Sequence, residues 1–173
     1  MEVNKSLNIQ EIVEKYIHEI KSATHDTVIC EHVWWTAIIG SVPWKWDIDI
    51  QIRVTQDEFL KIISALKTLY TIKRSELWSD TFAIFKSDEQ NIDGEIIPID
   101  LIVVVIGSDY DYFHLIRDAI SNNPEFLSEY NAIKQQYNPK SIVYLSDEYT
   151  AYSQAKVQLY KKICATTFDK IFS

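Results

Sequence analysis

The feature that most constrains the fold is a strongly apolar run, IIPIDLIVVVIG, at residues 96–107. Its β-branched residues favour a β-strand, and a strand that is apolar on both faces needs cover on both sides. We therefore expect this strand to lie at the centre of a sheet. A single acid, Asp100, interrupts the run. A buried carboxylate is costly unless it is paired or bound to a cation.

A second strand is predicted over residues 46–54, within the stretch VPWKWDIDIQIRV. Because side chains alternate between the two faces of a strand, Asp47, Asp49, Gln51 and Arg53 share one face. A solvated face would explain two acids at these positions without any function.

The alternative is a group of three carboxylates on neighbouring strands, formed by Asp47, Asp49 and Asp100. Such oxygen ligands suit Mg²⁺ or Mn²⁺, which take one or two carboxylates plus substrate phosphates. Two ions about 3.5–4 Å apart would clamp the attacking and leaving oxygens of a phosphoryl or nucleotidyl transfer. A competing interpretation is that Asp100 is capped by backbone groups or paired with Arg53, which would neutralise the acidic face without a metal.

The remaining elements follow from hydrophobic period and capping signals. Thr55 and Glu58 fit a capping box at the start of an amphipathic helix. The sequence Asn123-Pro124-Glu125 combines an N-cap residue with a proline at the first helical position. Further helices are predicted over residues 9–24, 110–120 and 146–170, strands over TVIC, VWWTAII, LYTIKR and TFAIFK, and a turn-rich connection over DEQNIDGE.

These elements predict one α+β domain over residues 1–173, with an α/β core over residues 1–107 and a helical C-terminal part over residues 108–173. The net charge of −8 does not suggest the basic face that phosphate-driven nucleic-acid binding needs. The first residues lack the apolar region of a signal peptide, so we expect none, and no apolar run is long enough to span a bilayer. We expect a cytoplasmic protein with two free thiols, no membrane partner and no strong nucleic-acid signal.

The stretch EHVWWTAIIGSVPWKWDIDI at residues 31–50 resembles the GrpB-like family of the nucleotidyltransferase (polymerase β-like) superfamily. The family pattern there is E-H-[IV]-G-S-T-[AS]-V-P-G-L-x-x-K-P-x-x-D-[IL]. Two later stretches, IRDAISNNPEFLSEYNAIK and YSQAK, are similar to the family's F-R-D-x-x-x-x-x-P-E-x-x-x-E-Y-x-x-[LI]-K and Y-x-x-x-K. The resemblance covers about residues 28–165, and the first stretch keeps Glu31, His32, Thr36, Ala37, Gly40, Lys45 and Asp49.

The Gly-Ser turn of the superfamily falls in one of two registers. Gly40-Ser41 precedes Asp47 by only five residues, whereas Trp34-Trp35 has the expected spacing of eleven residues but no small side chains. Gly-Ser lets backbone N–H groups approach a phosphate. The two tryptophans would instead stack on a base or fill the core.

The resemblance implies a mixed β-sheet flanked by helices and a metal-dependent transfer of a nucleotidyl group from a nucleoside triphosphate to an unknown acceptor. Asp47 and Asp49 would bind Mg²⁺ or Mn²⁺ and the nucleotide phosphates. Asp100 would complete a second metal site and help deprotonate the acceptor. The residues expected to contact the nucleotide are Gly40, Ser41, Lys45 and Lys156.

Several alternatives stay open. A degenerate Gly-Ser turn would leave a non-catalytic protein that binds a nucleotide or another ligand. The stretch PWKWDIDIQI, followed by TQDEFLKI, is also similar to the LicD/fukutin branch, which is linked to phosphocholine or phosphosugar transfer. His32 is either a general base near neutral pH or a strand-end histidine. Lys156 either contacts a phosphate or is a solvated helix residue. For Arg117 with Asp118, the alternative to a functional role is a structural salt bridge in the helical extension.

Overall fold

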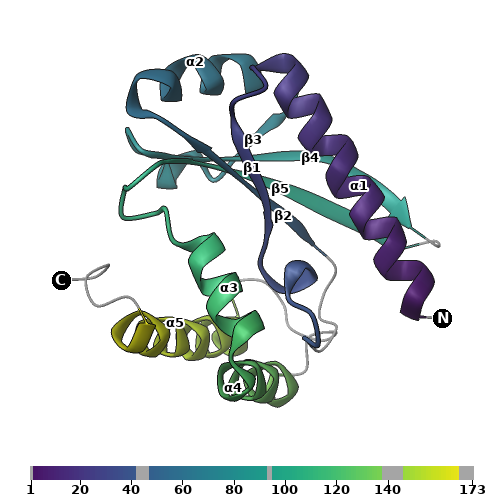
Figure 1. The fold of residues 1–173 in the computed structure, drawn as a ribbon, viewed down its shortest axis with the longest axis vertical. Helices are drawn as coiled ribbons and strands as arrows, with labels where there is room; N and C mark the ends of the chain where they lie inside the picture. Colours follow the sequence, from purple (N-terminus) through teal and green to yellow (C-terminus); the bar gives the residue numbers. More distant parts are fainter. Residues whose placement is uncertain (1, 42–46, 93–94, 138–145, 168–173) are drawn as a thin grey trace.

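The computed structural model describes residues 2–41, 47–92, 95–137 and 146–167, and its centre is a five-stranded sheet (Figure 1). The strand order is β1-β2-β5-β4-β3, so the apolar strand predicted to be central lies in the middle of the sheet. β2 and β5 are parallel, and the other neighbouring pairs are antiparallel. The strands are β1 (Ile29–Val33), β2 (Ile48–Val54), β3 (Thr71–Lys73), β4 (Phe82–Ile92) and β5 (Glu95–Val105).

One face of the sheet packs against α1 (Glu2–Ala23) and α2 (Gln56–Leu66). The alternate isoleucines of β2, Ile48, Ile50 and Ile52, are fully buried on this face. Removing each of these side chains from water stabilises the fold by about 1.5–3 kcal/mol. The two helices add residues at helical spacing to the same core, namely Ile9, Val13, Tyr16, Ile20, Phe59, Ile62, Ile63 and Leu66.

Two helices begin where the capping signals predict. At the N-terminus of α2, Glu58 Oε2 accepts hydrogen bonds from the Thr55 N–H at 3.2 Å and from Thr55 Oγ1 at 2.6 Å. The Asn123 side chain accepts a hydrogen bond at 2.9 Å from a backbone N–H in the first turn of α4 (Pro124–Gln136). A cap of this kind is worth about 1 kcal/mol. Local sequence therefore specifies both helix starts.

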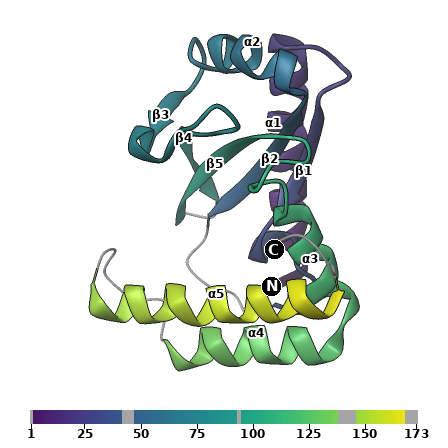
Figure 2. The ribbon, with the colours of Figure 1, turned by 90° about the vertical axis from the view of Figure 1, so that its left-hand side faces the viewer.

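The other face of the sheet meets the helical C-terminal part, which consists of α3 (Phe113–Asn122), α4 and α5 (Asp147–Thr167). Figure 2 shows α4 and α5 side by side below the sheet, with α3 leading down to them. Trp34 and Tyr112 pack both against the apolar cluster on the sheet and against the cluster that joins the three helices. The cluster on the sheet consists of Val33, Phe82, Ile84, Ile102 and Val104 of the strands, together with Phe113 of α3.

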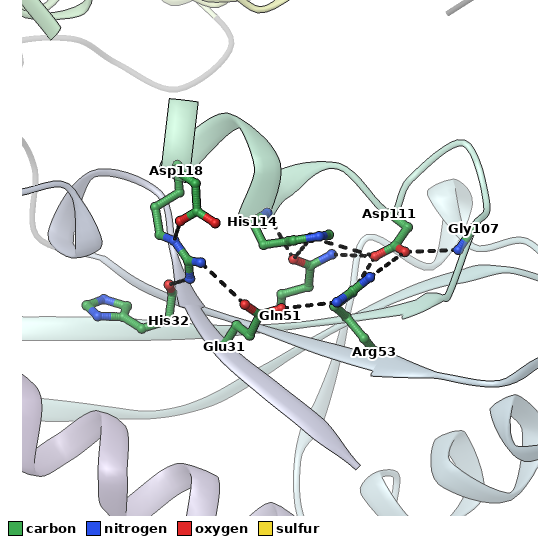
Figure 3. A network of polar contacts seen from close by, with 9 residues as sticks. Glu31, His32, Gln51, Arg53, Gly107, Asp111, His114 and Asp118 are labelled. Carbon is green, nitrogen blue, oxygen red and sulfur yellow. Dashed lines mark hydrogen bonds and ion pairs between the residues drawn. The ribbon is translucent and has the colours of Figure 1, made fainter. Parts of the chain in front are cut away.

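A network of polar contacts also holds α3 and the loop before it against this face (Figure 3). Arg53 of β2 donates to both carboxylate oxygens of Asp111, at 2.6 Å from Nε and 2.9 Å from Nη2. Gln51 Oε1 accepts a hydrogen bond from the His114 backbone N–H at 3.1 Å. Arg117 of α3 donates to a backbone carbonyl of β1 at 2.7 Å. These bonds fix α3 relative to β1 and β2.

Two segments differ from the sequence prediction. The extended structure predicted for VWWTAII is wrong beyond Val33, because Trp34 has a φ of 63° and Trp35–Ala37 form a 3-10 helix. The turn-rich connection predicted for DEQNIDGE is wrong for its described residues, because β4 continues to Ile92 and β5 begins at Glu95. Pairing between the two strands gives this polar segment a ladder of backbone hydrogen bonds, which overrides its turn propensity.

The two cysteines, Cys30 and Cys164, are free thiols, as predicted. Burial raises the pKa of the Cys30 thiol to about 11. A thiol with such a pKa is a weak nucleophile at neutral pH. Across the described residues, none of the helices combines the length and the apolar character that a membrane crossing requires.

We expect Asp111→Ala to lower the free energy of unfolding by about 2–4 kcal/mol. This loss is slightly smaller than the cost of removing one partner of a fully buried ion pair, because the Arg53 side chain is 18% exposed and water can solvate part of its charge. Urea unfolding followed by circular dichroism measures the change. Asp109→Ala, at an exposed site two residues away, is the matched control and should change stability by less than about 0.5 kcal/mol. Equal losses in the two variants would contradict a clamping role for Asp111.

Candidate functional site

The register of the sheet places two acids side by side. Asp49 on β2 is the direct partner of Asp100 on β5 in the parallel ladder. Direct partners project to the same face of a sheet, and here it is the face that also carries Gln51. Asp49 is 8% exposed, and the Asp100 side chain is 15% exposed. Two neighbouring carboxylates with so little water concentrate negative charge at this point.

Burial and neighbouring charges make the ionisation of Asp49 costly. Burial raises the pKa of the Asp49 carboxyl well above its ordinary value, and the charges of Asp47 and Asp100 raise it further. The charges of Lys73 and Lys156 lower it. The third predicted acid, Asp47, is thus near enough to act on the pair, and lysines from β3 and α5 act on the same site.

The two carboxylate oxygens of Asp100 have different surroundings. Oδ2 binds the ammonium group of Lys73, the last residue of β3. Oδ1 is buried and, among the described residues, has no hydrogen-bond partner. A buried carboxylate oxygen without a donor costs free energy, so this position suits a cation. The alternative pairing of Asp100 with Arg53 is wrong, because Arg53 binds Asp111 and Glu31 instead.

Asp49 and Asp100 fit a divalent cation that brings further ligands with it. Within the described part of the chain, no group of three or more His, Cys, Asp or Glu side chains is arranged to hold a metal ion. Asp47 therefore does not complete a preformed cage of three carboxylates. Mg²⁺ is usually held by one or two carboxylates together with substrate phosphates. The Asp49 carboxylate and Oδ1 of Asp100 could supply these one or two carboxylate ligands.

Lys156 reaches from α5 toward the same acids. Its ammonium group lies 4.5 Å from the Tyr152 ring centroid and 5.7 Å from the Trp34 ring. Burial lowers the pKa of Lys156, whereas the charges of Asp47 and Asp49 raise it. The side chain is half-buried and lies against two aromatic rings, which favours the alternative of a residue that faces the site over that of a solvated helix lysine.

The sequence-based interpretation missed Lys134 of α4, which is only 1% exposed. Its ammonium group donates to Ser41 Oγ at 2.5 Å and lies 4.8 Å from the Tyr130 ring centroid. Burial and the nearby charge of Lys156 lower the pKa of Lys134 to about 7. A signal was present, because Phe126, Tyr130 and Lys134 recur every four residues and so share the buried face of α4.

One face of α4 contacts the Gly40-Ser41 turn. Gly40 has a φ of 81°, which favours glycine, and an added Cβ would lie 3.3 Å from a side chain of α4. Asn131 donates to the Gly40 carbonyl at 3.0 Å, one turn before the contact of Lys134 with Ser41. This predicted phosphate turn is therefore tied to the helical C-terminal part. Lys45, which was also expected to contact phosphate, lies outside the described residues.

Trp34 follows β1 in a backbone conformation that glycine normally adopts. Its φ of 63° lies in the left-handed region, which costs an ordinary residue about 1–2 kcal/mol. Its ring packs against Phe113 and Tyr160, with centroid separations of 5.2 and 5.3 Å. Of the two predicted uses of this side chain, the structure has the one in which the ring fills the core. The turn nevertheless keeps a glycine-like backbone at this position.

His32 and Arg117 belong to the support around the site. His32 Nε2 and Thr36 Oγ1 are hydrogen-bonded at 2.7 Å. Burial and the nearby Arg117 charge lower the pKa of His32 to about 4, so this histidine is neutral at pH 7. This matches the prediction of a strand-end histidine. The predicted salt bridge between Arg117 and Asp118 is confirmed, at 2.7 Å.

The arrangement of helices and sheet occurs in a solved structure. The fold is similar to the crystal structure of GrpB from Enterococcus faecalis, with a TM-score of 0.65 and 15% identity over 91% of this chain and 93% of that chain. A likeness at this identity shows the fold alone. The predicted α+β class, with a mixed sheet flanked by helices and a helical C-terminal extension, is confirmed.

The sequence comparison is more specific. The GrpB protein family matches residues 4–166, so the chain belongs to the GrpB family. A UPF0157 protein of Vibrio cholerae serotype O1 is 29% identical over 126 residues, which cover 72% of this chain and 63% of the relative. The chain thus spans less than two thirds of that relative's length. The predicted GrpB-like resemblance is confirmed, and it is consistent with the polymerase β-like superfamily.

We expect Asp49→Asn to raise the free energy of unfolding in metal-free buffer by about 0.5–2 kcal/mol at pH 7, the usual range for a stabilising substitution. The pKa of Asp49 is higher in the folded chain than in the unfolded one, so its ionisation costs stability as the pH rises. The advantage of the variant should therefore grow from about pH 4, the unfolded pKa, upward.

Urea unfolding in EDTA at several pH values measures this difference. Asp26→Asn changes the same charge at an exposed site before β1 and serves as the matched control, with no pH-dependent gain expected. A variant at position 49 that is less stable than the wild type across the whole pH range would contradict the electrostatic description of the acid pair.

Proposed function

We propose that the chain is a metal-dependent nucleotidyltransferase that moves a nucleotidyl group from a nucleoside triphosphate to an acceptor hydroxyl or amine. The observation that carries this proposal is the in-register pairing of Asp49 with Asp100, with Oδ1 of Asp100 lacking a partner among the described residues. Neighbouring buried acids repel each other and destabilise the fold, and such groups with shifted pKa values are typical of functional sites.

In this proposal Asp49 and Asp100 hold a Mg²⁺ or Mn²⁺ ion, and Asp47 joins them when the nucleotide is bound. When bound by these carboxylates, such an ion would supply charge neutralisation at the phosphates and at the leaving oxygen. Asp47 is suited to this role because its charge already acts on the Asp49 carboxyl. A shift of the ligand set on nucleotide binding agrees with the lack, within the described residues, of a preformed group of three ligands.

The cationic side of the proposed site comes from the helical C-terminal part. Lys156 lies within range of the Asp47 and Asp49 charges, and the charge of Lys156 in turn acts on Lys134. Two such lysines would neutralise the β- and γ-phosphates of a nucleotide whose α-phosphate lies at the acids. Ser41, which accepts the hydrogen bond from Lys134, belongs to the same proposed phosphate contact. Lys45, which lies outside the described residues, stays a prediction from the sequence.

The proposed reaction balances without any further reactant. The acceptor oxygen or nitrogen attacks the α-phosphorus, and the bond from that phosphorus to the bridging oxygen of the β-phosphate breaks. The electron pair of that bond leaves with the pyrophosphate. Asp100 accepts the proton that the acceptor loses, which is the ordinary work of a carboxylate base.

A second candidate is a non-catalytic binding protein, and one observation favours it. Trp34 lies in the left-handed turn after β1, and its ring packs against the apolar clusters on both sides. A Gly-Ser turn would have small side chains here and would leave the backbone accessible. A phosphate could not approach the backbone there as it approaches a Gly-Ser turn. This candidate predicts ligand binding that does not depend on a metal ion.

A thermal-shift experiment separates the two candidates. We expect Mg²⁺ or Mn²⁺ together with one of ATP, CTP, GTP or UTP to stabilise the wild type by about 2.7 kcal/mol at a hundredfold excess over Kd, or roughly 5–10 °C. Asp49→Asn should abolish this gain, whereas Asp26→Asn should keep it. Pyrophosphate release with candidate acceptors then tests catalysis.

The other outcomes contradict the proposal in distinct ways. An equal nucleotide response in EDTA and in Asp49→Asn would identify a metal-independent binding protein. A response to phosphocholine or phosphosugar donors, but to no nucleoside triphosphate, would favour head-group transfer. No response in any combination would show that the acid pair has no nucleotide function.

We also expect Lys156→Met to weaken binding of the metal–nucleotide complex by roughly tenfold to a hundredfold, because a partly buried positive charge next to the phosphates is lost. The free protein should not lose stability through this charge, since burial disfavours it. Lys161→Met changes an exposed lysine of α5 and is the matched control. Isothermal titration calorimetry would contradict the assignment if both variants bound the nucleotide equally well.

A further inference from the structure

Lys73 is a cation that the protein itself places on the acid pair. It is the last residue of β3, which stands two strands away from β5 in the sheet order. Its register partner on β4 is Ile84, whose partner on β5 is Ile102. The lysine side chain therefore lies on the same face as Asp100 and reaches it across β4 to form an ion pair.

The backbone of Lys73 is fixed in a way that holds this side chain in place. The Trp78 indole N–H donates to the Lys73 carbonyl at 3.1 Å, and the Trp78 ring packs against Phe85 at 5.1 Å between centroids. Arg74, the next residue, has a φ of 49° in the left-handed region, and the strand ends before it. The end of β3 is thus anchored, and its lysine is directed over the sheet.

The contact of Lys73 covers only one of the two oxygens of Asp100. Lys73 binds Oδ2, while Oδ1 has no hydrogen-bond partner among the described residues. The same lysine charge also favours ionised Asp49. The charge of one ammonium group therefore stabilises both ionised acids. It still leaves Oδ1 of Asp100, which a divalent ion could bind, without a partner among the described residues.

We infer that Lys73 is the resident counter-ion of the acid pair, and that a divalent ion at Asp49 and Oδ1 of Asp100 competes with this lysine and drives its ammonium group off Oδ2. The inference rests on the proposed function, because it takes the acid pair to be the metal site. The ion would take Oδ1 while the ammonium group holds Oδ2 of the same carboxylate. Two cations so close together repel each other, so the lysine lowers the affinity for the bare ion. The displaced lysine then becomes available to the phosphates that arrive with the ion.

The chain offers a matched control for this role. Lys86 of β4 is the direct register partner of Asp100, but its side chain is exposed. Substitution of Lys86 removes the same formal charge beside the same acid. A general charge effect would appear at both lysines, whereas displacement of a bound ammonium group would appear only at Lys73.

The experiment titrates Mn²⁺, without nucleotide, into the full chain and follows free Mn²⁺ by electron paramagnetic resonance. We expect Lys73→Met to bind Mn²⁺ roughly tenfold more tightly than the wild type, within the usual range of coupling between two ligands of one site. Lys86→Met should differ from the wild type by less than about twofold, as expected for a screened surface charge. Lys73→Arg, which keeps a cation, should stay close to the wild-type affinity.

A fold check accompanies the titration, because Lys73→Met leaves the acid pair without its cation. If this variant unfolds in EDTA, its recovery by Mn²⁺ at concentrations that leave Lys73→Arg unchanged supports the inference. Unchanged or weaker Mn²⁺ binding by Lys73→Met, or an equal gain in Lys86→Met, would overturn it. The absence of Mn²⁺ binding in every variant would overturn it as well.

These failures differ from a failure of the proposed function. The proposed function is tested with the metal–nucleotide complex and with Asp49→Asn, so it can stand even when bare Mn²⁺ binds all lysine variants alike. Conversely, tighter Mn²⁺ binding by Lys73→Met, without any nucleotide response in the wild type, would support the displacement and contradict nucleotidyl transfer.

Discussion

The parallel pairing of β2 with β5 is the constraint on which the rest of the structure depends. The register of this ladder decides that Asp49 meets Asp100. A shift by one residue would set Asp49 beside an apolar residue and turn the acids to opposite faces, since side chains alternate along a strand. The apolar residues of β2 resist that shift because Ile48, Ile50 and Ile52 are buried against α1 and α2. The hydrophobic effect thus holds two mutually repelling carboxylates together.

Local patterns account for the parts of the fold that the sequence predicts well. A run such as LIVVV can only be buried, which identifies β5 as a central strand, and the caps at Thr55 and Asn123 begin their helices through contacts within a few residues. The common face of Asp49, Gln51 and Arg53 likewise follows from strand alternation alone. In each case the deciding interaction lies within a single element, so no knowledge of its neighbours in space is needed.

The partners of the charged groups could not be predicted in this way. Arg53 shares a face with the acids, yet it binds Asp111, which lies in the loop after β5. The cation at Asp100 is instead Lys73, which the order of the strands brings across the sheet. The chain has 17 lysines and arginines, and neither composition nor hydrophobic period shows which of them pairs with which acid. The pairings depend on strand order and on the path of the chain after β5, which are properties of the whole fold.

At Trp34, a local backbone strain is offset by packing against residues that are distant in the sequence. Its left-handed backbone costs about 1–2 kcal/mol, and burial of a large aromatic side chain returns a similar amount. The ring packs against Phe113 and Tyr160, and the Lys156 ammonium group lies 5.7 Å from it. The turn after β1 therefore keeps its shape with a bulky residue. An aromatic side chain beside a lysine replaces an open backbone at this point, so anion binding here would depend on the lysine rather than on backbone N–H groups.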